Sequence, residues 1–581
     1  MLLRIFVVAF SICSSTGLFA QSLKPFMEPD VQQQHWVDSV FKKIKRKERI
    51  GQMFFLRAHT NLGKAYEDSV AKLIKTNKVG GLVFFQGGPG RQANLTKTYQ
   101  SISEVPLLIA MDAEWGLGMR LDSTISYPYQ MTLGAIQDNS LIYAMGREIA
   151  RDFKRLGMHL NFAPVSDINN NPRNPVINYR SFGDNKYNVA LKAAAYMKGL
   201  QDEGVLVSIK HFPGHGDTDV DSHGDLPKLN FTRERLDSLE LYPFKELIAK
   251  GASGVMVAHM NIPALDSTEN LPSTLSRPII TGLLKEDLGF KGLAISDAME
   301  MKGVTKYFSN GEADVRAIMA GNDIIELSEN TERAIKLARE AIKAKRLERS
   351  QVIASVKKIL AAKYWAKVGQ QPGTDSSSIS AFLNRPEAQA LNQKLADAAV
   401  TVLKGDSLLK IFTPSENTAI ISVGVTDLTV FQREVSISFP NSTNYILSKI
   451  ASQVDVDRVK KELRNYKQIV LAIHDYRKRP LSSLDYNNTL KKFIGDVVAM
   501  NPMVCLFANP YTIGGLPALE QAGTLIVNYQ NNDEMQRAVA KVVAGKIPAS
   551  GRLPVTVSPG LKTGDGLQYF PIPPIVSGQV E

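Results

Sequence analysis

The feature that most constrains the fold is an alternation of short apolar runs with amphipathic stretches, which continues from about residue 80 to residue 330. The apolar runs are only four or five residues long, a length that suits strands better than helices. Helix-like stretches separate them, for example at 141–156, 188–203 and 233–250. This alternation predicts a parallel sheet covered by helices. The expected strands span 81–85, 107–111, 159–162, 205–209, 254–258, 292–296 and 323–327.

The number of strand-and-helix units fits a closed barrel. Seven or eight units over about 330 residues are typical of a (β/α)8 TIM-type barrel, which we place at residues 30–366. A segment at 33–56 with spaced apolar residues is expected to be helical. Ionisable residues end six consecutive strands, and closure would bring them to one rim, where barrel enzymes have their active sites. These residues are Asp112, Asp167, Lys210, His211, His259, Asp297 and Glu326.

A second α/β pattern follows the barrel. Residues 367–384 are rich in Gly, Pro, Ser and Asp in their first part and form an expected linker. Residues 385–560 predict a smaller α/β sandwich domain, with strands at 419–423, 469–473, 504–507 and 525–527. Residues 561–581, which contain three prolines, are expected to form a C-terminal tail.

The first twenty residues predict a cleaved secretory signal. Arg4 precedes a short apolar core, and small residues lead up to Ala20. Cys13 would leave with this segment, so only Cys505 would remain and no intrachain disulfide could form. Export without disulfides favours the periplasm, with no stable membrane insertion once the signal is removed.

The net charge of +12 favours anionic surroundings, such as cell-wall polymers. The basic run at 42–47 has no interleaved aromatic residues and is expected to be a solvated helix face. We therefore expect no nucleic-acid partner.

The stretch at 210–227 concentrates the polar chemistry, with three of the eight histidines and four aspartates. Asp221 and His223 are two residues apart, so on extended backbone both side chains project to one side. The carboxylate could orient the imidazole as a general acid and base. A plain surface loop rich in Gly and Asp is the alternative. Zinc or manganese binding is a further alternative, but the spacing does not match two histidines on one helix face, and we expect no metal.

Other strand ends supply further candidates. Asp297 directly follows an apolar run and could be a nucleophile, or it could cap a following helix. Lys210 and His211 could donate hydrogen bonds to substrate hydroxyls, and Asp112 could accept them. Arg180 could bind a ligand or brace its loop.

These motifs together resemble glycoside hydrolase family 3, specifically its β-N-acetylglucosaminidase branch. The K-H-F-P-G-H-G-x4-D-S-H stretch runs from Lys210 to His223, and S-D-A-M runs from Ser296. N-F-A-P-V-S-D ends at Asp167, and R-S-F-G begins at Arg180. In the second domain, A-N-P-Y at 508–511 and G-R-L-P-V-T at 551–556 also match, so the resemblance covers about residues 35–560.

The resemblance implies a retaining exo-hydrolase for terminal β-linked N-acetylglucosamine, without a cofactor. Asp297 would be the nucleophile, and His223, oriented by Asp221, would be the acid/base. Peptidoglycan fragments would be the carbohydrate substrate. One departure from the family pattern is Trp115, which replaces a glycine and leaves the role of Arg120 open. The residues implied to bind the sugar ring are Asp112, Arg180, Lys210 and His211.

Four other functions remain open at this point. A phosphorylase would use phosphate in place of water, because an imidazole repels phosphate less than a carboxylate does. A family 3 β-glucosidase would take its acid/base carboxylate from the second domain, where no motif for it is found. A metal-dependent hydrolase and a non-catalytic cell-wall binding protein are the other two.

Overall fold

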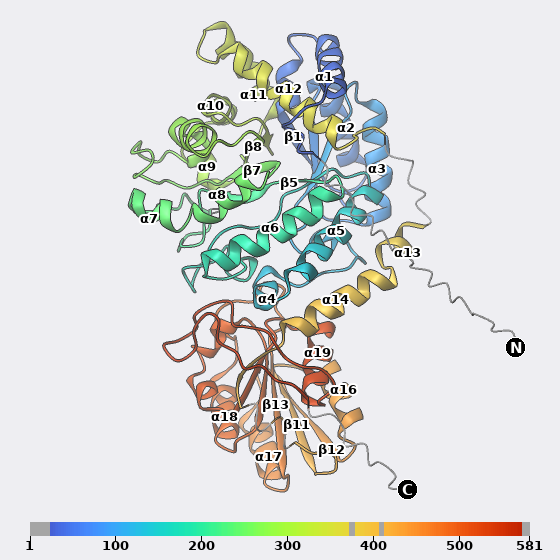
Figure 1. Ribbon diagram of the computed structural model, residues 1–581, viewed down its shortest axis with the longest axis vertical. Helices are drawn as coiled ribbons and strands as arrows, with labels where there is room; N and C mark the ends of the chain where they lie inside the picture. Colours follow the sequence, from blue (N-terminus) through green and yellow to red (C-terminus); the bar gives the residue numbers. More distant parts are fainter. Residues whose placement is uncertain (1–23, 223, 371–377, 406–408, 410–411, 572–581) are drawn as a thin grey trace, which may run out of the picture.

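The computed structural model describes residues 24–222, 224–370, 378–405, 409 and 412–571. The expected signal at 1–20 and the side chain of His223 lie outside these residues. Two α/β units follow one another along the chain (Figure 1). Within the described ranges, no helix is long and apolar enough to cross a membrane.

The first unit is a barrel of parallel strands. One sheet has the order β5-β4-β3-β2-β1-β9 and a second has the order β6-β7-β8. A parallel bridge between Ile295 and Ile324 joins β8 to the segment that leads into β9. β5 and β6 are separated only by Ser208, so they occupy one position in an irregular ring of eight. The strands are β1 (Phe54–Ala58), β2 (Gly81–Phe84), β3 (Leu108–Met111), β4 (Leu160–Asn161), β5 (Leu206–Val207), β6 (Ile209–Phe212), β7 (Gly254–Val257), β8 (Leu293–Ser296) and β9 (Ile325–Glu326).

Helices surround this ring on its outer face (Figure 1). Their apolar faces and the buried strands form one continuous hydrophobic core, which burial from water stabilises. The main ones are α1 (Val31–Lys43), α2 (Lys64–Asn77), α3 (Pro89–Ile102), α5 (Asn139–Arg155), α6 (Lys186–Asp202), α8 (Tyr242–Ala249), α10 (Glu312–Ala320), α11 (Thr331–Lys343) and α12 (Arg349–Trp365). Three shorter helices are α4 (Gln130–Ala135), α7 (Arg233–Ser238) and α9 (Lys302–Thr305), and a π-helix, η5, spans Pro278–Asp287.

The expectation of a helix over 33–56 is wrong in its second half. α1 ends at Lys43, a 3-10 turn covers Arg49–Met53, and β1 begins at Phe54. Phe54 and Phe55 are fully buried, and β1 pairs with both β2 and β9. As a strand in this central position, β1 pairs with the backbones of β2 and β9. If the helix continued through these residues, the facing edges of β2 and β9 would have no backbone partner.

The second unit is a three-layer sandwich, which confirms the expected α/β barrel followed by a smaller α/β domain. Its sheet has the order β10-β15-β14-β13-β11-β12, and all pairs are parallel except β10 with β15. The strands are β10 (Thr401–Lys404), β11 (Thr418–Val423), β12 (Ser442–Leu447), β13 (Gln468–His474), β14 (Met503–Phe507) and β15 (Thr524–Val527). The helices are α14 (Pro386–Ala399), α16 (Val430–Ser438), α17 (Gln453–Leu463), α18 (Asn488–Val498) and α19 (Asp533–Val543).

Two segments at the borders of this domain are also ordered in the structure. Within 367–384, a short helix, α13 (Ile379–Leu383), contacts the barrel helices α3 and α5. Beyond residue 560, Leu567 bridges to Val402 and Tyr569 bridges to Ala549. Residues 561–571 therefore pack on the sandwich domain.

The sandwich domain contacts barrel loops on the rim side. The Asn509 side-chain amide donates a hydrogen bond to the Asn178 side-chain oxygen at 2.6 Å. Asn169 donates to the hydroxyl oxygen of Tyr511 at 2.9 Å. Asn169 and Asn178 lie in the long loop that follows β4. The second domain thereby fixes a loop that borders the carboxyl ends of the barrel strands.

Candidate active site

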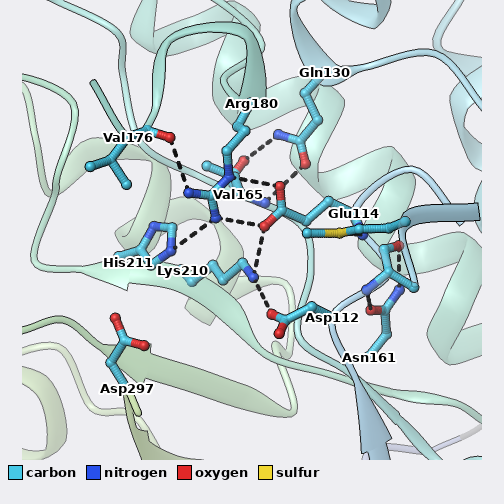
Figure 2. A network of polar contacts seen from close by, with 12 residues as sticks. Asp112, Glu114, Gln130, Asn161, Val165, Val176, Arg180, Lys210, His211 and Asp297 are labelled. Carbon is cyan, nitrogen blue, oxygen red and sulfur yellow. Dashed lines mark hydrogen bonds and ion pairs between the residues drawn. The ribbon is translucent and has the colours of Figure 1, made fainter. Parts of the chain in front are cut away.

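Five of the seven predicted site residues have side chains around the mouth of the barrel (Figure 2). Asp112 follows β3, Lys210 and His211 lie in β6, and Asp297 follows β8. Arg180 comes from a 3-10 turn, η3 (Asn178–Arg180), in the loop after β4. Four of these residues form one polar network, and the fifth, Asp297, faces that network across the mouth. The network members are Asp112, Lys210, His211 and Arg180.

Lys210 is the central cation of the network. Its side chain is buried, and Nζ lies 2.7 Å from Oδ1 of Asp112 and 2.9 Å from Oε1 of Glu114. Burial alone would lower the pKa of Lys210, but the charges of Asp112 and Glu114 raise it above its ordinary value. Lys210 therefore remains charged, with two of its donors already directed at carboxylates.

Asp112 is held as an anion by two cations. Arg120 approaches its Oδ2 at 2.8 Å, opposite the oxygen bound by Lys210. Burial would raise the pKa of Asp112, but the charges of Lys210 and Arg120 outweigh burial and lower it. Arg120 also lies over the ring of Phe85, 4.7 Å from its centroid. The role that the sequence left open for Arg120 is thus to neutralise and position Asp112.

Glu114 and Arg180 form a bidentate ion pair beneath the mouth. Arg180 Nε and Nη2 lie 2.9 and 2.6 Å from the two carboxylate oxygens of Glu114, and Nη1 donates to the backbone oxygen of Val176 at 3.1 Å. Burial would raise the pKa of Glu114, but the Arg180 and Lys210 charges lower it to about 2. No role for Glu114 was predicted from the sequence. Its position three residues after the end of β3, close to Asp112, was the available signal.

His211 is oriented by Asp167, at the end of the N-F-A-P-V-S-D motif. Nδ1 of His211 lies 2.6 Å from Oδ2 of Asp167, and Nε2 lies 3.3 Å from Nη2 of Arg180. Because a guanidinium can only donate, Nε2 accepts and Nδ1 carries the proton that Asp167 accepts. Asp167 also accepts from the backbone N–H of His211 and, at 2.7 Å, from that of His215. The imidazole is fixed in one tautomer and one direction.

Asp297 presents its carboxylate from a turn, not from a helix cap. The next helix, α9, has Met301 at its N-cap, so the capping interpretation is wrong. The Asp297 backbone N–H donates to Val257 at 3.0 Å, and Oδ1 accepts from the backbone N–H of Ala298 at 2.8 Å. These contacts tie the residue to β7 and leave the carboxylate facing the Lys210 network (Figure 2).

Asp221 lies in an exposed loop that is anchored from below. Its backbone oxygen accepts from the N–H groups of Gly224 and Asp225 at 2.9 and 3.1 Å. The neighbouring Ser222 is buried, and its hydroxyl lies 3.0 Å from Nε2 of His215. Burial lowers the pKa of His215 to about 4, so this ring is a neutral anchor. His223 is outside the described residues, so the pairing of Asp221 with His223 stays a prediction.

The donors of the metal interpretation do not converge where the structure describes them. His215 bonds Ser222 and Thr218, and Asp217 pairs with Arg235. Among the described residues, no three His, Cys, Asp or Glu side chains are grouped as metal ligands would be. These hydrogen bonds and the ion pair assign His215 and Asp217 to loop structure.

Trp115 stands where the family pattern has a glycine. Its ring makes an edge contact with Tyr129 at 4.7 Å between centroids and lies 6.3 Å from Tyr179. The Tyr129 hydroxyl donates to the backbone oxygen of Lys478 in the second domain at 2.9 Å. Trp115 therefore belongs to an aromatic cluster between the network and the second domain.

Comparison with known proteins identifies the family of the chain. Residues 46–362 match the family model described as the glycosyl hydrolase family 3 N-terminal domain. Beta-hexosaminidase A of Pseudoalteromonas piscicida is 28% identical over 551 residues, which cover 84% of this chain and 91% of that protein. Beta-hexosaminidase LpqI of Mycobacterium tuberculosis is 32% identical over 52% of this chain and 79% of its own.

Solved structures extend the similarity across both domains. A family 3 β-N-acetylglucosaminidase from Paenibacillus is 30% identical, with a TM-score of 0.75 over 89% of this chain and 99% of that one. A structure described as beta-glucoside phosphorylase BglX is 22% identical with a TM-score of 0.77, and this likeness concerns the fold alone. The family resemblance drawn from the motifs is confirmed: the chain belongs to glycosyl hydrolase family 3 and is a glycoside hydrolase.

Proposed function

We propose that the protein is a retaining exo-β-N-acetylglucosaminidase. The observation that carries the proposal is the placement of Asp297 opposite the network of Asp112, Lys210, Arg180 and His211 (Figure 2). This arrangement supplies a carboxylate that faces a set of oriented polar groups (Figure 2). The hexosaminidase and β-N-acetylglucosaminidase named above support the sugar preference.

The network is suited to bind sugar hydroxyls. Ionised Asp112 is an acceptor for hydroxyl groups, and Lys210 has three N–H donors, of which two are directed at carboxylates. Both groups are fixed by buried partners, so little conformational freedom is lost when a sugar binds. Their charges cancel locally, which suits a neutral ring.

The proposed reaction is a double displacement. Asp297 attacks the anomeric carbon as the bond to the leaving oxygen breaks, and His223 gives its proton to that oxygen. Water then attacks the glycosyl-enzyme, His223 takes a proton from the water, and the Asp297 carboxylate is released. Asp221 would hold the imidazole in the required tautomer. Together, the two steps return His223 and Asp297 to their starting protonation states.

The proposed natural substrates are peptidoglycan fragments with terminal N-acetylglucosamine. The net charge of +12 suits anionic cell-wall material.

We also propose that the chain is exported to the periplasm after removal of residues 1–20. Fractionation of cells that produce the full chain, with sequencing of the mature N-terminus, tests this. Recovery of uncleaved protein in the cytoplasm would contradict it.

The test of the activity uses the nitrophenyl β-N-acetylglucosaminide beside the β-glucoside, with and without added phosphate. The wild type should hydrolyse the first substrate and need no phosphate. Asp297→Asn should lose activity by a factor of roughly 10³ or more, because the nucleophile is removed. Asp219→Asn, an exposed change in the same loop region as Asp221, is the control and should keep activity.

Two outcomes would redirect the proposal. Faster turnover of the β-glucoside would favour the activity that the Cellulomonas fimi relative named Beta-N-acetylglucosaminidase/beta-glucosidase also carries in its name. A rate that depends on phosphate would indicate a phosphorylase. A fluorinated glycoside that traps the intermediate should label Asp297, as peptide mass spectrometry can establish, and labelling of another carboxylate would reject the assigned nucleophile.

A further inference from the structure

A carboxyl group outside the predicted site lies beside the nucleophile strand. Glu326 ends β9, between β8 and β1, and pairs in register with Phe55. Its backbone N–H donates to the Ser296 hydroxyl at 2.9 Å, and its backbone oxygen accepts from Met299 at 3.0 Å. These two bonds bracket Asp297. Glu326 is only 3% exposed, so its position in the barrel is fixed by the same turn that carries the nucleophile.

The cations near this carboxyl are committed to other groups. Lys210 contacts Asp112 and Glu114, and Arg57 bonds Glu300. Within the described part of the chain, no ion pair includes Glu326, and its Oε2 has no hydrogen-bond partner. A buried oxygen without a partner costs free energy unless a ligand satisfies it.

The surrounding charges favour the neutral form of this acid. Burial raises the pKa of Glu326 well above its ordinary value, and the negative charges of Asp112 and Asp297 raise it further. Lys210 and Arg57 act in the opposite direction with smaller effect. A protonated carboxyl has one O–H donor, whereas ionised Asp112 and Asp297 can only accept.

The backbone next to Glu326 adopts an uncommon conformation. Leu327 has a φ of 49°, in the left-handed region that leucine rarely adopts, while its N–H donates to Phe55 at 3.1 Å. Such strain persists where surrounding contacts enforce it and is concentrated at functional sites. Here it ends β9 immediately after Glu326.

We propose that Glu326 is a further substrate-binding residue, which acts as a neutral carboxylic acid and donates a hydrogen bond to a sugar oxygen held between Asp112 and Asp297. The inference rests on the proposed use of this mouth as a sugar site. It adds a donor on the side of the nucleophile, where the ionised carboxylates provide none. It assigns a function to a strand end for which the sequence suggested no role.

Two substitutions separate the hydrogen bond from packing. Glu326→Gln keeps the size and a donor without a charge, and Glu326→Leu fills the space without polar atoms. On the aryl glycoside that the wild type hydrolyses best, kcat/KM should stay within roughly fivefold for the Gln variant and fall by on the order of 10- to 100-fold for the Leu variant. Ile325→Leu, on the same strand, is the control for repacking.

The kinetic outcomes decide the substrate contact. Unchanged kcat/KM in a folded Glu326→Leu protein would overturn it. Equal losses in the Gln and Leu variants would also overturn it, because the charged form would then be the active one. The variants are compared on the substrate that the wild type hydrolyses best. A preference of the wild type for another sugar would therefore refute the N-acetylglucosamine assignment, but the comparison of Glu326→Gln with Glu326→Leu would remain valid.

The protonation state is tested without any substrate. The infrared difference spectrum of the wild type minus Glu326→Gln at pH 7 should contain the band of a protonated carboxyl, and the subtraction removes the contribution of Asp152, whose pKa burial raises to about 7. The pKa of Glu326 is higher in the folded protein than in the unfolded chain. The free energy of unfolding of the wild type therefore falls as pH rises from the unfolded-state pKa to the folded-state pKa. The Tm advantage of Glu326→Gln should therefore grow from about pH 4.5 upward. Absence of the band, or a Tm difference independent of pH, would overturn the neutral acid.

Discussion

Glu114→Gln tests whether the buried ion network stabilises the barrel. Glu114 is fully buried and forms ion pairs with Arg180 at 2.6 Å and Lys210 at 2.9 Å. The substitution preserves shape but removes the anion, so Arg180 loses its carboxylate partner while Lys210 keeps Asp112. Breaking a buried pair by removing one partner costs about 3–5 kcal/mol, because an uncompensated charge stays buried.

The magnitude can also be obtained from the pKa of Glu114. That pKa falls from an ordinary 4.5 to about 2 in the folded protein. A difference of one pKa unit corresponds to about 1.4 kcal/mol, so this carboxyl contributes roughly 3 kcal/mol to stability at pH 7. Since the folded pKa is the lower one, the contribution is present above about pH 4.5 and is lost as pH falls toward 2. Roughly half should remain at pH 3.

The assay is urea unfolding at pH 7 and at pH 3, followed by tryptophan fluorescence. All three tryptophans, Trp36, Trp115 and Trp365, lie in the barrel, so the signal reports this domain. Glu269→Gln makes the same chemical change in an exposed loop and should stay within about 0.5 kcal/mol of wild type. If Glu114→Gln is no less stable than this control at pH 7, the network does not stabilise the fold. A loss that is equal at both pH values would refute its electrostatic origin.

Three further changes test other contacts. Asp167→Asn should lower the free energy of unfolding by about 1–3 kcal/mol at pH 7 in urea titrations, and lower kcat/KM, because one amide oxygen cannot accept from all the N–H donors that the carboxylate satisfies. Lys363→Met should raise Tm at pH 6, because burial lowers the pKa of Lys363 to about 7 and folding must otherwise bury a charge. This gain should shrink toward pH 10, since wild-type stability rises with pH wherever the unfolded chain binds more protons. Asn509→Ala should lower kcat/KM roughly fivefold in the aryl glycoside assay, because the loop containing Asn178 loses a hydrogen bond.

Much of the architecture could be predicted because parallel strands are marked by apolar runs. The seven expected barrel strands all lie at or beside observed strands, since their burial on both faces requires continuous apolar sequence. β1 was missed because its apolar residues follow the basic amphipathic segment that ends α1, and a helix pattern could be extended through them. β12, Ser442–Leu447, was missed because an edge strand with exposed residues has no such run.

The site could be predicted only as far as strand ends define it. The rule that chemistry gathers at the carboxyl ends of strands located Asp112, Lys210 and Asp297. It could not find the pair between Glu114 and Arg180, which are 66 residues apart in sequence, because that pairing depends on how the loop after β4 folds back over the rim. The positions of Glu114 and Arg180 along the chain do not indicate how close their side chains lie in space.

The loop after β4 also connects the sandwich domain to the site. No catalytic group was identified in the sandwich domain, but the domain contacts this loop. The A-N-P-Y motif at 508–511 supplies Asn509 and Tyr511, which bond Asn178 and Asn169. Asn178 is two residues before Arg180, and its φ of 40° belongs to the left-handed region that asparagine adopts more readily than most residues. The hydrogen bond from Asn509 therefore holds the turn that aims the guanidinium at Glu114. The second domain thereby contributes to the position of Arg180 in the polar network at the barrel mouth.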